Sequence, residues 1–198
     1  MKPGKCQIKY FEVDELRLTK TGKYAKVIEL APGSLFTRNA VVKYTGVDLE
    51  RDILKAVAVE CVKGSGEIGI GFLKGFGLTR GAVATTLTQG RGSIIAVGKS
   101  DEDIASAIRR VAALGQGAAV VSGGMTMAEL SLSPAEHLSN EAVDQTTALY
   151  KSLEQLGCRL ADPLAVLALL TVTSIPELRL TPTGLYDPGK PGNVPLFE

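Results

Sequence analysis

The sequence has few of the residues that usually carry metal-dependent or nucleophilic catalysis. It contains one histidine, His137, and neither an HxH nor an HExxH motif. The zinc-deaminase signature, HxE followed by PCxxC, is missing as well. Because a catalytic zinc or iron site needs several clustered ligands, such a site would have to be built from Asp, Glu and Cys alone. We therefore expect no metal and no other cofactor, and we interpret His137 as a loop residue before a helix.

Cysteine is also scarce in the chain. Cys6, Cys61 and Cys158 are widely spaced, and no pair has the CxxC spacing. This pattern favours reduced thiols in a cytoplasmic protein. Cys61 follows an apolar segment, which favours a buried and unreactive thiol, and the single histidine gives no context for a Ser-His or Cys-His pair. We predict no catalytic residue in this chain.

The sequence lacks an excess of charge and a long apolar run. Its 22 Lys and Arg residues nearly balance 21 Asp and Glu, for a net charge of +1. No overall field would draw it to nucleic acid or to an anionic membrane. The longest largely apolar stretch, 164–172, is far shorter than the roughly 20 residues of a membrane-spanning helix, and the N-terminus has no secretory apolar region. We expect neither a nucleic acid nor a membrane as partner.

Hydrophobic patterning predicts strands early in the chain and helices later. Strands are expected at 25–30, 40–44, 53–60, 82–87 and 94–97, with one or two more within 68–82. Two further strands, 118–122 and 125–130, flank Gly123-Gly124, which is a hairpin signal. Helices are expected at 100–115, 139–157 and 162–169, because each of these segments has capping residues at one or both ends.

The sequence predicts an α+β fold, a mixed and mainly antiparallel sheet with about three helices packed on it. Residues 1–23 are polar and are expected to form an N-terminal extension, either loosely ordered or an edge strand. Residues 24–198 form a single domain, since no linker or repeat divides them. The tail from Leu178 is expected to be a turn-rich, extended wrap. The second helix is expected to place Val143, Thr146, Tyr150 and Leu153 on one face.

One segment, 68–82, alternates glycine with large apolar residues and reads IGIGFLKGFGLTRGA. Because glycine costs backbone entropy in a strand, this pattern indicates bulges or the close approach of another backbone. The overlapping segment 64–69 matches GxGxxG, but it leads into a strand and not a helix, which favours a tight turn over a dinucleotide site. Lys74 and Arg80 are candidates to hold an anion or a carbonyl, or are solvated charges at a strand edge.

The glycine-rich segment resembles the GFxKGFGLxRGA stretch in the C-terminal domain of microbial adenine deaminases, which belong to the amidohydrolase superfamily. The similarity runs in order from about residue 24 to the C-terminus. It includes VIELAPGS before Thr37, the DxxKxxVxE pattern on Asp52, Lys55 and Glu60, and IPELRLT at 175–181. The resemblance implies that a metal-binding barrel, which precedes this domain in the family, converts adenine to hypoxanthine and ammonia. Only 23 residues precede the similarity here.

Two departures from the family pattern remove histidines. After Glu60 the family usually has Arg-His-His, whereas this chain has Cys61-Val62-Lys63. Before Ile94 the family has His-Asp-Ser-His-Asn, whereas this chain has QGRGS at 89–93. The resemblance implies that these residues face the active site. Their replacement predicts a domain that does not deaminate adenine alone.

Two functions remain open, besides direct deamination by this chain. The first is a module that binds a purine, another small ligand or a protein partner. The second is a subunit of a split adenine deaminase whose barrel is a separate amidohydrolase chain. A homo-oligomer formed through a sheet edge is also possible. The ligand-binding residues that we predict border the glycine loops: Lys63, Gly64, Glu67, Lys74, Gly75, Gly77 and Arg91.

Overall fold

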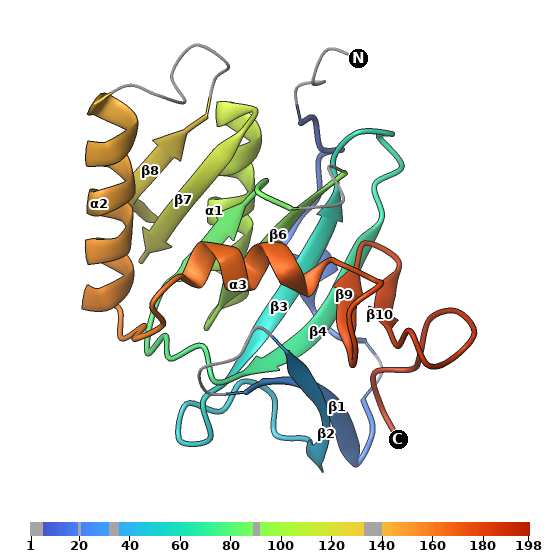
Figure 1. Ribbon diagram of the computed structural model, residues 1–198. Helices are drawn as coiled ribbons and strands as arrows, with labels where there is room; N and C mark the ends of the chain where they lie inside the picture. Colours follow the sequence, from blue (N-terminus) through green and yellow to red (C-terminus); the bar gives the residue numbers. More distant parts are fainter. Residues whose placement is uncertain (1–5, 20, 32–35, 89–91, 133–139) are drawn as a thin grey trace.

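The computed structural model describes residues 6–19, 21–31, 36–88, 92–132 and 140–198. Within these ranges the chain forms one eight-stranded sheet, three α-helices, one 3-10 helix and a separate two-stranded hairpin (Figure 1). The strands lie across the sheet in the order β2 (Thr37–Lys43), β1 (Tyr24–Leu30), β4 (Ile68–Lys74), β3 (Ile53–Glu60), β6 (Ser93–Gly98), β5 (Ala82–Thr85), β7 (Gly117–Ser122) and β8 (Met125–Ser131). In this sheet β1 and β4 pair in parallel, and the other neighbours are antiparallel. The predicted α+β class and the mainly antiparallel sheet are confirmed.

The sheet separates two layers of apolar side chains. Helix α1 (Asp101–Leu114) packs on one face, where it contacts β5, β6 and β7. Helices α2 (Asn140–Gln155) and α3 (Pro163–Leu170) pack on the other face together with the hairpin of β9 (Arg179–Thr181) and β10 (Gly184–Tyr186) (Figure 1). Because successive strand residues point to opposite faces, both faces of the central strands are apolar. This explains why β3 is buried along its whole length.

The predicted helix and hairpin signals are confirmed. The Ser100 hydroxyl accepts the Asp103 N–H at 3.3 Å and caps α1. The Asp162 carboxylate accepts the Ala165 N–H at 2.9 Å and caps α3. Strands β7 and β8 pair across Gly123-Gly124, whose φ angles of 60° and 76° suit a hairpin turn of the primed type.

The predicted buried face of α2 is wrong for Val143. The residues that α2 and its C-terminal end bury in the core are Leu149, Leu153 and Leu156, whereas Val143 is 64% exposed. Of the predicted face, Leu153 is buried and Thr146 and Tyr150 are half-buried. The apolar stripe is rotated around the helix, because the leucines that fit the sheet outweigh an isolated valine near the start of α2.

The described part of the N-terminal segment, residues 6–19, is packed on the sheet, in contrast to the expected loose start or edge strand. It contains the 3-10 helix η1 (Val13–Leu16) and buries Cys6, Phe11 and Leu16 in the α1 layer. Two distant cations hold its carbonyls: Lys55 Nζ donates to Leu16 O at 3.0 Å, and an Arg109 guanidinium nitrogen donates to Phe11 O at 2.8 Å. Such partners leave no local sequence pattern. The predicted domain boundary at residue 23 stays a prediction.

The glycine alternation in β4 lets the β9–β10 hairpin approach closely. A Cβ atom at Gly69 would lie 1.9 Å from the Thr181 carbonyl oxygen, and one at Gly71 would lie 3.1 Å from a methyl carbon of Leu185. The predicted approach of another backbone is therefore confirmed. The GxGxxG match lies in the connection between the antiparallel strands β3 and β4, which confirms the turn interpretation.

Candidate functional site

Two loops lie side by side at one end of the sheet. Glu60 at the end of β3 is opposite Ser93 at the start of β6, and the Cys61 N–H donates to Gly92 O at 3.0 Å. We use the name "paired loops" for residues 61–67 together with residues 86–88 and 92. Arg91 is predicted to bind a ligand beside Gly92, but it lies outside the described residues, as does His137.

The carboxylate of Glu60 fixes the first of the paired loops. Glu60 is only 5% exposed. Its side-chain oxygens accept backbone N–H groups from Val62 at 2.6 Å, Lys63 at 2.5 Å and Ser65 at 3.1 Å. Burial alone would raise the pKa of Glu60, but these donors outweigh it and hold the pKa below its usual value. The loop therefore has a defined backbone shape, and Glu60 is occupied in maintaining it.

The outward side chains of the paired loops form a mixed surface. Val62 is 60% exposed, and Leu87 is also exposed. Lys63 and Glu67, two of the predicted ligand-binding residues, carry opposite charges and are exposed in the same loop, with Gly64 between them in sequence. Lys63, Gly64 and Glu67 thus lie in one loop with the exposed Val62.

The other predicted ligand-binding residues, Lys74, Gly75 and Gly77, lie at the opposite end of β4. This strand has seven residues, so the two groups are about 20 Å apart. Lys74 Nζ pairs with Glu29 Oε1 at 2.6 Å. A small ligand would not contact both groups. A binding role stays a prediction for each group separately.

Gly75 and Gly77 form a turn that Asp52 holds in place. The Gly75 N–H donates to the Asp52 carbonyl at 3.0 Å, and the Gly77 N–H donates to the Asp52 carboxylate at 2.9 Å. Burial raises the pKa of Asp52 above its usual value, although the Gly77 N–H and Lys74 oppose the shift. A Cβ atom at Gly77 would lie 3.1 Å from the Gly157 carbonyl, at the end of α2. The φ angle of 89° at Gly77 and this tight packing together account for glycine at this position.

The charged residues of the DxxKxxVxE pattern are structural anchors that sequence reasoning missed. Asp52 holds the turn after β4, and Glu60 holds the first paired loop. Lys55 is buried, donates to Leu16 O and forms an ion pair with the Asp101 carboxylate at the start of α1. Charged residues in and next to an otherwise apolar strand were the signal for such anchors. A buried charge requires a partner, so each of them had to bind another part of the chain.

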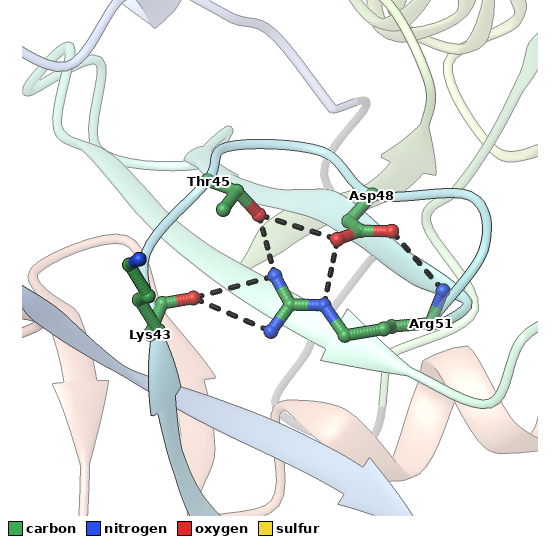
Figure 2. Close-up of polar contacts among 4 residues, drawn as sticks. All are labelled: Lys43, Thr45, Asp48 and Arg51. Atoms are coloured by element: carbon green, nitrogen blue, oxygen red, sulfur yellow. Dashed lines mark hydrogen bonds and ion pairs between the residues drawn. The ribbon is translucent and has the colours of Figure 1, made fainter.

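A second polar cluster, in the connection between β2 and β3, centres on Arg51 (Figure 2). Its guanidinium donates to the Asp48 carboxylate at 2.6 Å, to the Thr45 hydroxyl at 2.5 Å and to the Lys43 carbonyl at 3.3 and 3.4 Å. The hydrogen bonds from Arg51 lower the pKa of Asp48. A shallow hollow of about 10 Å³ beside it is far smaller than the usual ligand pocket of roughly 300–1,000 Å³. Arg51 therefore braces the loop, and each of its three guanidinium nitrogens already donates within it.

The described residues contain no group of three or more His, Cys, Asp or Glu side chains that could hold a metal ion. Cys6, Cys61 and Cys158 are free thiols in this structure. None of the helices in the described ranges combines the length and apolar character needed to span a bilayer.

Known proteins match most of this chain. The sequence model of the family described as "Adenine deaminase C-terminal domain" matches residues 34–190. The adenine deaminase of Archaeoglobus fulgidus is 40% identical over 172 residues, which cover 85% of this chain and 31% of that protein. The adenine deaminase of Methanoculleus marisnigri is 40% identical over 194 residues, covering 94% of this chain and 37% of that protein.

A third relative covers similar shares of the two proteins. The adenine deaminase of Listeria monocytogenes is 36% identical over 190 residues, which cover 90% of this chain and 33% of that protein. The chain therefore spans about a third of the length of these curated relatives. Together with the family match over most of its residues, this similarity shows that the chain belongs to the adenine deaminase C-terminal domain family.

Proposed function

We propose that this chain is a non-catalytic domain that docks on a metal-binding amidohydrolase barrel through its paired loops. The barrel would convert adenine to hypoxanthine and ammonia, and it would lie on the same polypeptide or on a separate chain. The chain matches about a third of proteins named adenine deaminase, so the metal ligands would come from the other two thirds. The free cysteines fit a reducing compartment, and we place the protein in the cytoplasm.

The shape and exposure of the paired loops carry this proposal. Three backbone N–H groups on the Glu60 carboxylate fix the loop that presents Val62. A rigid loop loses little conformational entropy on binding, and an exposed apolar side chain gains by burial in an interface. Lys63 and Glu67 would form the polar rim of the contact. The missing metal ligands among the described residues agree with a supporting role.

Affinity capture with the purified chain tests the docking. The bait recovers an amidohydrolase from native lysate, identified by mass spectrometry. Val62→Asp places a charge in the contact and should lower recovery about tenfold, which corresponds to about 1.4 kcal/mol. Val143→Asp is the matched control, because Val143 is equally exposed on the distant helix α2. Equal recovery with both variants would contradict the proposal. No amidohydrolase with the wild type would exclude a barrel on a separate chain.

Binding of a purine or another small ligand at the same loops is the second candidate. It is favoured by the exposed Lys63 and Glu67, whose opposite charges flank Gly64 at one end of the sheet. Titration of the chain with adenine and hypoxanthine in a calorimeter tests it. Heat that saturates, and that is lost in Glu67→Gln, supports a ligand site. No heat at millimolar ligand rules it out.

A further inference from the structure

Two of the three cysteines lie side by side on the α1 face of the sheet, although they are far apart in sequence. Cys6 is 6% exposed and Cys61 is 3% exposed, and both belong to the same apolar cluster. The two thiols lie close enough for each to shift the pKa of the other. Cys158 is also buried, but it lies in the cluster on the opposite face of the sheet. The fold thus pairs two thiols and leaves the third apart.

The backbones around the two thiols are also joined. The Gln7 N–H donates to the Cys61 carbonyl at 2.8 Å, and the Cys6 N–H donates to Gly115 O at 3.2 Å. Extended segments joined by backbone hydrogen bonds lie about 5 Å apart. Disulfides form between Cα atoms about 4.4–6.8 Å apart. The two cysteines therefore need little backbone movement to form a bond.

We propose that Cys6 and Cys61 form a reversible disulfide when the protein meets a peroxide. This site is independent of the proposed docking function.

The interaction between the two thiols lowers the pKa of Cys61 and, with burial, raises the pKa of Cys6. In the proposed reaction Cys61 therefore acts as the first nucleophile. The Cys61 thiolate attacks the peroxide: an S–O bond forms, the O–O bond breaks, and the leaving oxygen takes a proton to become water. The Cys6 sulfur then attacks the sulfenic acid: an S–S bond forms, the S–O bond breaks, and the departing hydroxide takes the Cys6 proton. Two thiols are oxidised and one peroxide is reduced to two waters.

The bond would fasten the N-terminal segment to the base of the paired loops. Cys61 directly follows Glu60, and its N–H donates to Gly92 O in the second loop. The cross-link also restricts the unfolded chain, which stabilises the fold. We expect the oxidised protein to melt about 5–10 °C above the reduced protein.

Intact mass measurement of the whole chain tests the disulfide. After treatment with a small excess of hydrogen peroxide, the monomer should lose the mass of two hydrogen atoms, and dithiothreitol should restore it. Digestion without reductant should yield a linked peptide that contains both Cys6 and Cys61. Cys6→Ser and Cys61→Ser should abolish the mass change, whereas Cys158→Ser should retain it. Peptide mapping of the wild type identifies the linked cysteines even where a variant folds poorly.

Several results would overturn the proposal. A disulfide from either thiol to Cys158, a disulfide-linked dimer, or sulfinic acid on Cys61 without a disulfide would each do so. An unchanged mass at a peroxide concentration that fully oxidises dithiothreitol would do so as well.

Discussion

At the scale of single residues, Glu60 shows how a charged side chain in this fold acts on backbone. It is buried at the end of β3, and it accepts N–H groups from three residues of the next loop. Asp52 does the same for the turn after β4. These residues were visible in the sequence as part of a family pattern, but their partners were not. A carboxylate that binds backbone N–H groups leaves no signature in the residue types around it.

We predict that Glu60→Gln lowers the free energy of unfolding by about 1–3 kcal/mol at neutral pH, since a neutral amide oxygen accepts hydrogen bonds less strongly than the carboxylate. The folded state holds the pKa of Glu60 below its usual value. Its contribution is thus complete above the unfolded pKa and is lost as the pH falls through the folded pKa. Urea unfolding from pH 7 down to about pH 3 measures this.

The control for this prediction is Glu67→Gln, an exposed change in the same loop, which should alter stability by less than about 0.5 kcal/mol. The wild type should lose its advantage over E60Q as the pH falls. An advantage of the same size at both ends of the pH range would show that the carboxylate is not the stabilising group.

At the scale of elements, the approach of the β9–β10 hairpin to β4 depends on glycine. A methyl group at Gly69 would overlap the Thr181 carbonyl oxygen, which belongs to backbone and has little freedom to move. We predict that Gly69→Ala destabilises the fold by about 1–3 kcal/mol. Gly189→Ala, at an exposed position in the tail, should change stability by less than about 0.5 kcal/mol. Thermal unfolding compares the two, and similar melting temperatures would refute the close approach.

The elements that the sequence predicted well are those with local signals. Ser100, Asp162 and Gly123-Gly124 act through hydrogen bonds or backbone angles within a few residues, and the structure has each of these features. The packing of residues 6–19 and the buried face of α2 depend on partners distant in the chain. The predicted ligand-binding residues fall into two groups because β4 separates them: one group lies before the strand and the other at its far end and beyond.

At the scale of the whole molecule, the sheet is covered on both faces and presents the paired loops at one end (Figure 1). Family membership was predictable from sequence, because the glycine spacing and the anchoring charges recur in order. The proximity of 61–67 to 92 required the fold, since it follows from the pairing of β3 with β6. This arrangement gives the domain a fixed surface, through which we propose that it docks on a metal-binding barrel.

The most direct test of this account is adenine turnover by the purified chain, followed by ultraviolet absorbance, with and without added Mn²⁺ or Fe²⁺. The account predicts no turnover above buffer under either condition, because water activation at neutral pH needs a metal or a perturbed base. Turnover that follows the protein through purification and disappears with a chelator would contradict it, and would mean that this chain builds its own metal site.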